Sequence, residues 1–184
     1  IKDLSNILFA YDDRILFLAE DSSQYPGVTK PSGMGGLGFN YKWDMGWMND
    51  TLKYFKLDPI YRKYHHNQLT FSMMYYYNEQ FVLPFSHDEV VHMKGSLLNK
   101  MPGDQWQQFA NYRCLIGYMM THPGKKLLFM GNELASYDEW HFEGELPWSV
   151  LKYPTHDSAN RYVKELTTLY KNEPAFWELD YDPM

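Results

Sequence analysis

Acidic residues follow three of the most apolar stretches in this 184-residue sequence. Glu20 comes directly after residues 15–19, Asp88 lies three positions after residues 81–85, and Glu133 lies three positions after residues 126–130. Cleavage of a glycosidic bond uses two carboxyl groups, one to protonate the leaving oxygen and one to attack or stabilise the sugar cation. Glu20 and Asp88 are therefore candidates for acid–base chemistry, although two carboxylates at strand ends can equally be solvated caps.

The apolar stretches themselves predict the elements that must position these acids. Each stretch is continuous rather than alternating, which is typical of strands covered on both faces in a parallel sheet. Residues 69–77 form a fourth run, rich in aromatic residues and Met, which we interpret as a strand with a short helix as the alternative. Pro84 predicts a local distortion of its strand, because proline cannot donate a ladder hydrogen bond.

Helical spacing fills the stretches between the predicted strands. The predicted helices cover residues 43–55, the segment from Asp58 towards His66, residues 104–122 and residues 157–173. Asp58 and Asp104 are expected to cap their helices. Trp106 is expected on the apolar stripe of the third helix, and Cys114 is expected in its buried face. The order strand, helix, strand, strand, helix, strand, helix predicts an α/β fold with a parallel sheet.

Two long irregular segments, residues 21–41 and 134–157, follow predicted strands. Long segments without regular structure are usually functional, and in α/β barrels the loops after the strands carry the active site. A full barrel needs roughly 250 residues, so about four strands indicate half a barrel. We therefore expect Glu20, Asp88 and Glu133 to face one cleft.

The composition excludes several classes of protein. Acidic residues outnumber basic residues by 23 to 17, and the formal net charge of −6 argues against nucleic acid as a partner. The longest uncharged apolar run, residues 114–121, is too short to span a membrane. A single cysteine and no signal segment after Ile1 favour a reducing, cytoplasmic location. The aromatic content of 18% fits either a ring-rich core or surfaces that stack on sugars.

Two motif-like patterns lack the context that their chemistry needs. Residues 33–38 match the spacing G-x-G-x-x-G, but about a dozen residues separate them from the preceding strand. His87 and His92 suggest a metal site, yet the residue four before His92 is Asp88, where a zinc-protease helix requires histidine. We therefore expect no metal and no cofactor, and a metal-dependent hydrolase using both histidines is the weaker alternative.

Several longer motifs are more specific. They are residues 19–23 (AEDSS), 26–29 (PGVT), 35–39 (GGLGF), 42–48 (KWDMGWM), 81–92 (FVLPFSHDEVVH), 101–104 (MPGD) and 128–133 (LFMGNE). Across them the chain resembles the 1,4-α-glucan (glycogen) branching enzymes of glycoside hydrolase family 13. Other members of the wider amylase family share the barrel and the His-Asp pair but not the surrounding strings, so an α-amylase-type hydrolase is the less favoured alternative.

The resemblance implies a retaining double displacement in the C-terminal half of a (β/α)8 barrel. A nucleophilic Asp would attack the anomeric carbon of an α-1,4 linkage. Glu20 would protonate the departing O4 and later deprotonate the C6 hydroxyl of the acceptor, which forms an α-1,6 branch. Asp88 would stabilise the transition state, and the substrate-binding residues would be His87, Glu133 and Asp21.

The resemblance also implies that the chain is a piece of a longer catalyst. Residues 1–173 would form the second half of the barrel, and residues 174–184 would begin a linker to a C-terminal β domain. The segment with the nucleophilic Asp, roughly Gly-Phe-Arg-x-Asp, does not occur among the 184 residues. The chain alone is therefore expected to bind α-glucan without branching it, and the open edges of half a barrel predict self-association. A glucan-binding module without catalysis is the alternative from another class.

Overall fold

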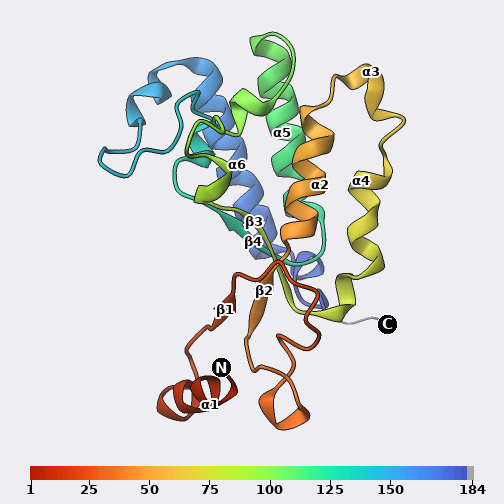
Figure 1. Cartoon of the computed structure of the whole chain (residues 1–184). Helices are drawn as coiled ribbons and strands as arrows, with labels where there is room; N and C mark the ends of the chain where they lie inside the picture. The colour runs from red at the N-terminus through yellow and green to blue at the C-terminus, as the bar shows by residue number, and fades with distance from the viewer. Residues whose placement is uncertain (182–184) are drawn as a thin grey trace.

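Four parallel strands form the centre of the structure, a computed structural model that describes residues 1–181 (Figure 1). The strands are β1 (Leu18–Ala19), β2 (Tyr41–Trp43), β3 (Phe81–Phe85) and β4 (Lys125–Leu128). They lie in the sheet in the order of the sequence, and each neighbouring pair is parallel. The predicted α/β class and parallel sheet are confirmed, and the carboxyl ends of the strands share one edge of the sheet.

Helices and short 3-10 segments connect the strands. The α-helices are α1 (Lys2–Tyr11), α2 (Met45–Lys56), α3 (Pro59–Arg62), α4 (Asn67–Thr70), α5 (Gln105–Thr121) and α6 (Pro154–Asn172). The 3-10 segments are η1 (Ser32–Met34), η2 (Phe71–Met74), η3 (Tyr76–Asn78), η4 (His87–Glu89), η5 (Leu98–Lys100), η6 (Asn132–Leu134), η7 (Trp148–Lys152) and η8 (Pro174–Phe176). Figure 1 shows α2, α5 and α6 side by side, while α1 lies at the opposite end of the molecule. None of the helices within residues 1–181 has the length and apolarity needed to cross a bilayer.

The hydrophobic core lies between β3 and the three long helices. All five residues of β3 are buried, which explains why their sequence is continuously apolar. The largest side chains packed around them include Trp47 of α2 and Tyr112 of α5. Removing this much apolar surface from water stabilises the sheet. The buried packing of β3 also fixes the position at which the chain leaves the strand and continues into residues 86–89.

Pro84 does not interrupt β3, contrary to the expected distortion. Val82 O accepts a hydrogen bond from Asp44 N at the end of β2, whereas Phe85 O accepts one from Phe129 N on the β4 side. The backbone N and O of successive residues in a strand point to opposite neighbouring strands, so Pro84 faces the same side as Val82. The nitrogen of Pro84 therefore points to the β2 side, beyond the last residue of β2. No ladder hydrogen bond is lost there, and the pairing with β4 continues through Phe85.

The cap predicted for α5 is confirmed. The Asp104 side chain accepts a hydrogen bond from Gln107 N at 2.9 Å, and the Gln107 side chain accepts one from Asp104 N at 2.8 Å. Two predictions for α5 are wrong, because Trp106 is 74% exposed and Cys114 is exposed. Cys114 lies two positions from buried Tyr112, and such a step turns a side chain to the far side of a helix.

Residues 69–77 are helical, so their interpretation as a strand is wrong. They continue from α4 into η2 and η3, and buried Ser72 and Tyr76 recur with a helical spacing of four residues. The strand that the prediction missed is β2. The predicted helix of residues 43–55 includes Trp43, but in the structure Trp43 ends β2 and the helix begins at Met45. A three-residue strand that contains Lys42 carries no apolar run to reveal it.

The end of the described chain packs back onto the sheet. The Tyr181 hydroxyl donates to Phe81 O at 3.0 Å, and Lys125 lies 3.0 Å from the carboxylate of Asp180. Within residues 174–181, predicted as the start of a linker, Asp180 and Tyr181 thus contact the first residues of β4 and β3. The rest of that predicted linker, residues 182–184, lies outside the described residues, and the division at residue 173 stays a prediction.

Candidate functional site

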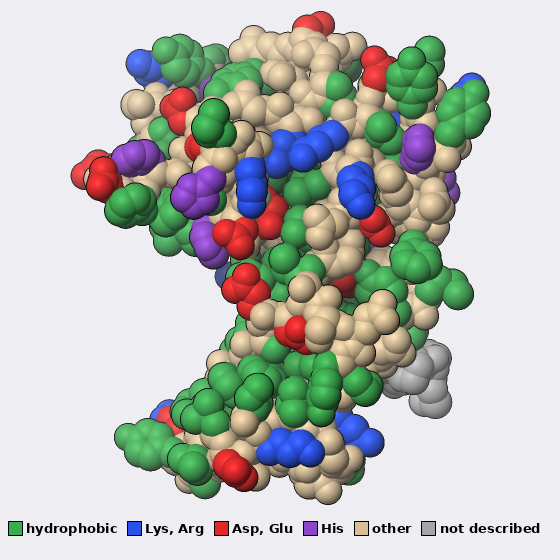
Figure 2. Space-filling model, in the orientation of Figure 1, with side chains coloured by type: hydrophobic (Ala, Val, Ile, Leu, Met, Phe, Trp, Pro, Cys, Tyr) green, Lys and Arg blue, Asp and Glu red, His purple; other side chains and the backbone are tan. Residues whose placement is uncertain are grey.

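The residues that follow the four strands are the candidate site. Glu20 follows β1, Asp44 follows β2, the pair His87 and Asp88 follows β3, and Glu133 follows β4. Figure 2 shows acidic and histidine side chains gathered above a hollow in the surface on the left of the molecule. The exposure and the hydrogen-bond partners of each side chain decide which of them can bind a ligand.

Glu20 is exposed, and the next residue anchors the chain beside it. Asp21 accepts hydrogen bonds from the backbone N and the hydroxyl of Ser23, both at 2.9 Å, and lies 3.0 Å from Nζ of Lys42 on β2. The Ser23 backbone N–H and the Lys42 ammonium lower the pKa of Asp21. Asp21 therefore ties the end of β1 to β2, and this contact fixes the backbone from which Glu20 projects.

A buried glutamate holds the long segment between β1 and β2. Glu79 accepts hydrogen bonds from Val28 N at 2.8 Å, from Thr29 N at 2.7 Å and from the Thr29 hydroxyl at 2.5 Å. Each of its two carboxylate oxygens is occupied in this way. The segment that the sequence predicted to be irregular is thus fixed at its middle, although it contains only one short 3-10 element, η1.

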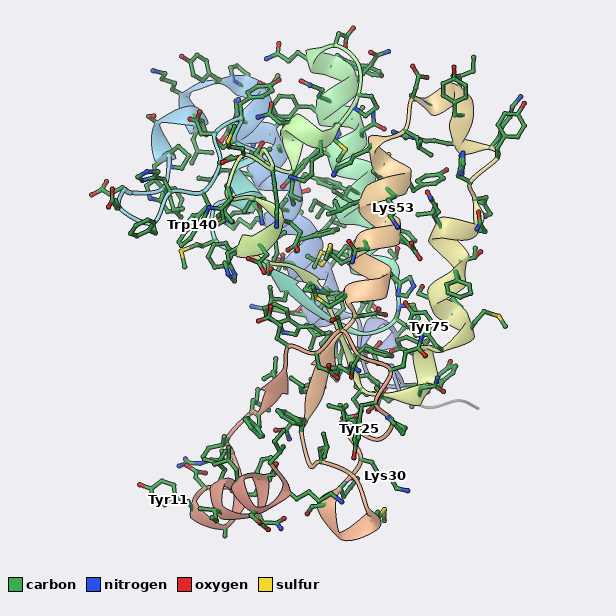
Figure 3. All side chains as sticks on the ribbon, in the orientation of Figure 1. Tyr11, Tyr25, Lys30, Lys53, Tyr75 and Trp140 are labelled. Carbon is green, nitrogen blue, oxygen red and sulfur yellow. The ribbon has the colours of Figure 1, made fainter. Side chains whose placement is uncertain are left out.

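Asp44, which follows β2, is a buried capping residue that the sequence analysis missed. It caps α2 by accepting from Trp47 N at 2.8 Å, and the same oxygen accepts from the Tyr75 hydroxyl at 3.0 Å. Figure 3 shows Tyr75 reaching towards the start of α2. A Cβ on Gly46 would lie 2.6 Å from the Tyr75 hydroxyl oxygen, so this contact requires glycine there. The spacing of an aspartate before an apolar helical run could have revealed the cap but not the burial.

The pH dependence of stability is expected to change when Asp44 is replaced by Asn. Burial raises the pKa of Asp44, and within residues 1–181 its second oxygen is buried without a hydrogen-bond partner. Between the unfolded pKa and this raised value the folded state binds more protons, so Asp44 makes folding less favourable as pH rises. The free energy of unfolding of Asp44→Asn, relative to the unsubstituted chain, should therefore increase from pH 4 to pH 7 in urea titrations. A difference in the free energy of unfolding that stays the same from pH 4 to pH 7 would contradict this expectation. Asp138→Asn, at an exposed position, is the matched control.

The turn after β3 brings His87 and Asp88 together. Ser86 caps the turn, and the Glu89 carboxylate accepts from Ser86 N at 2.6 Å and from the Ser86 hydroxyl at 2.7 Å. His87 Nε2 then lies 3.3 Å from an oxygen of Asp88, with both side chains nearly half exposed. A donor and an acceptor thus stand side by side at the surface, an arrangement that can bind neighbouring hydroxyl groups.

Glu133 lies in η6, the short 3-10 segment that follows β4. It lines an open depression between β4 and α6 together with Lys126, Leu128 and Asn160. Its backbone oxygen accepts from the Asn160 side chain at 3.3 Å. The turn that carries Glu133 begins at Gly131, whose φ of +87° is strained for other residues.

The structure brings some of the predicted residues into contact and not others. His87 contacts Asp88, and both follow the carboxyl end of β3, whereas Glu20 follows the same edge at β1. With β2 between them, β1 and β3 are separated by two strand spacings of about 4.8 Å. That Glu20, Asp88 and Glu133 face one cleft stays a prediction. Within residues 1–181, no three His, Cys, Asp or Glu side chains are grouped as a metal ion would require.

Comparison with known proteins gives matches over nearly the whole chain. A protein of Halothermothrix orenii named 1,4-alpha-glucan branching enzyme GlgB is 58% identical over 182 residues, which are 99% of this chain and 29% of that protein. The proteins of the same name from Oceanobacillus iheyensis and Aquifex aeolicus are 58% and 59% identical, over 98% and 90% of this chain. No family model matches the chain. The chain spans less than a third of the length of these relatives, and the resemblance seen in its motifs is confirmed.

Proposed function

We propose that this chain, a homologue of part of the 1,4-α-glucan branching enzymes, forms the C-terminal half of a (β/α)8 catalytic barrel. Its strands lie in sequence order without the reversal that marks a doubly wound sheet, which supports a barrel segment. Helices occupy the connections from β2 to β3 and from β3 to β4. In this proposal residues 1–173 belong to the barrel, and residues 174–184 lead towards a further domain.

The proposed reaction transfers a glucan chain by two displacements in glycogen synthesis. A nucleophilic Asp from outside these 184 residues forms the glycosyl–enzyme bond while Glu20 gives its proton to the departing O4. Glu20 then takes the proton of an acceptor C6 hydroxyl, which attacks the anomeric carbon and releases the nucleophile. The exposed position of Glu20 at the carboxyl end of β1, beside the Asp21–Lys42 ion pair, supports this role.

His87 and Asp88 are proposed to hold the hydroxyls of the sugar that is transferred. Their contact at 3.3 Å and their partial exposure support a joint role. Hydrogen bonds that strengthen as the sugar ring flattens lower the barrier, because they favour the transition state over the ground state. Asp21 and Glu133 complete the proposed glucan-binding set.

The observation that carries the proposal is the identity of 54–59% to branching enzymes across this chain. The test is a chimera in which this chain replaces the matching 182 residues of the Halothermothrix orenii relative. Amylose treated with the chimera should gain α-1,6 linkages, which debranching and chain-length analysis detect, whereas the isolated chain should leave the iodine stain of amylose unchanged. Shortened linear chains would indicate a hydrolase, and glucan binding without any product would indicate a binding module.

The isolated chain is also expected to self-associate. Exposed apolar side chains cluster on α1 and on the segment that leads to β1, among them Leu4, Ile7 and Leu16. Because β1 and β4 each have one unpaired edge in the described sheet, a second chain could cover these surfaces. Light scattering at micromolar concentrations should give the mass of a dimer or larger, and a constant monomer mass would contradict this expectation.

A further inference from the structure

Lys100 has an unusual set of partners in the loop between β3 and α5. Its ammonium donates to the backbone oxygens of Glu89 at 2.6 Å, Lys94 at 2.9 Å and Gly95 at 2.5 Å. An ammonium has three N–H donors, so these three nearest oxygens occupy all of them, while Ser96 O lies at the longer distance of 3.5 Å. Within residues 1–181, no carboxylate forms an ion pair with Lys100. Its charge is therefore used to hold backbone, not to pair with an acid.

The loop that Lys100 holds begins at the candidate residues. Glu89 ends the turn that carries His87 and Asp88. The backbone oxygen of Asp88 is held in addition by Lys94 Nζ at 2.7 Å. Two lysines thus bind two successive carbonyls of this one turn, so movement of the loop would move the His87–Asp88 pair.

The same loop has a backbone that needs support. His92 and Met93 have φ values of 54° and 66°, a left-handed conformation that costs about 1 kcal/mol or more for residues with a side chain. Glu139, from the loop after β4, accepts from Met93 N at 3.1 Å and from Gly95 N at 2.5 Å. Lys100 binds the carbonyl oxygens of this loop, and Glu139 binds its N–H groups.

The loop after β4 is attached to this loop at a second point. Trp140 N donates to Val90 O at 3.0 Å, and Figure 3 shows the Trp140 side chain at this junction. Phe129, just after β4, packs on the edge of Trp140 with ring centres 4.9 Å apart and also lies against His87. The surroundings of His87 therefore come from both loops, which depend on each other for their conformation.

We propose that Lys100 is a positioning residue for the His87–Asp88 pair. It fixes the loop of residues 89–95 by binding its carbonyl oxygens, while Glu139, from the loop after β4, binds its N–H groups. This role rests on the function proposed for the pair. Lysine suits the position because three carbonyls converge on one nitrogen, whereas the donors of arginine are spread over a plane.

The test compares Lys100→Met and Lys100→Arg with Lys53→Met, a control on the outer face of α2 (Figure 3). In the 184-residue chain, amide hydrogen exchange of residues 89–95 should be about 10- to 100-fold faster in Lys100→Met, with β3 unchanged. The NMR signals of the His87 ring should shift in the same variant. Lys100→Arg, which keeps the charge, should show smaller changes in the same direction and serves if Lys100→Met does not fold.

Activity provides a readout that loop stability alone would not change. In the chimera, Lys100→Met should lower kcat about tenfold or more with KM changed less than about twofold, because contacts made in the transition state are lost. Folded variants with unchanged exchange and unchanged His87 signals would overturn the inference, and so would a loosened loop with full kcat. A chimera that makes no branches even with Lys100 intact counts against the proposed function, while exchange and the His87 signals still decide whether Lys100 positions the pair.

Discussion

Replacing Glu20 by Gln is expected to slow glucan transfer by the chimera by about 100- to 10,000-fold, the usual contribution of a positioned proton donor. Glutamine keeps the shape of the side chain but has no proton to give to the departing O4. It also cannot accept the proton of the acceptor hydroxyl in the second step. Initial rates over a range of amylose concentrations would separate kcat from KM, and the loss should fall mainly on kcat.

The control for this substitution is Glu143→Gln. Glu143 is an exposed acid in the segment after β4 and has no role in the proposed mechanism. Its replacement should leave the rate within about twofold, as is usual for exposed sites away from the reaction. Equal rates for the Glu20 and Glu143 variants would contradict the assignment of Glu20, provided that both variants unfold at the same urea concentration.

Replacing Glu79 by Ala is expected to cost about 3 kcal/mol of the free energy of unfolding, because hydrogen bonds to a charged group contribute roughly 1.5–3 kcal/mol each and are not additive. The change leaves Val28 N and Thr29 N in a buried place without an acceptor. The segment between β1 and β2 should then become mobile. Urea unfolding measures the loss, and faster amide exchange at residues 28 and 29 would locate it.

Glu79→Gln distinguishes the carboxylate from the mere size of the side chain. One of its two terminal atoms would become an NH2 group that faces an N–H donor, so glutamine should recover less than half of the loss. Glu165→Ala, at an exposed position of α6, is the control and should change the stability little. A Glu79→Gln variant as stable as the unsubstituted chain would show that the charge and both oxygens are unnecessary.

Elements with strong local signals were predictable from the sequence. The caps at Asp58 and Asp104 are short-range arrangements, in which a side chain bonds a backbone N–H two or three residues away. Strand β3 was evident because a strand buried on both faces leaves a continuous apolar run. Helix α6 was predicted with a start three residues late, since the helix begins at Pro154.

Features that depend on distant partners were not predictable in this way. Strand β2 is three residues long and is defined by its pairing with β1 and β3. Glu79 binds backbone about fifty positions earlier in the chain, and no local pattern encodes such a contact. Asp44 and Lys100 likewise act through backbone groups and burial that sequence spacing does not reveal.

The candidate site falls between these two cases. Strand ends, together with the motif resemblance, identified Glu20 and Asp88, and the sheet order explains why both follow the same edge. The contact between His87 and Asp88 needed the capped turn at Ser86, which the sequence analysis did not recognise. For Glu133 the sequence located the turn but not the depression beside α6 that its side chain lines.

The most direct test of the role of Glu20 compares two leaving groups in the chimera. Fluoride departs with little need for a proton, whereas the O4 of a glucan chain needs one. Glu20→Gln should therefore slow the cleavage of an α-1,4 glucan more than it slows the release of fluoride from a maltooligosyl fluoride, both measured in a single turnover. The fold-loss for the glucan should be at least about ten times the fold-loss for the fluoride. Equal losses for the two substrates would contradict the assignment of Glu20 as the proton donor.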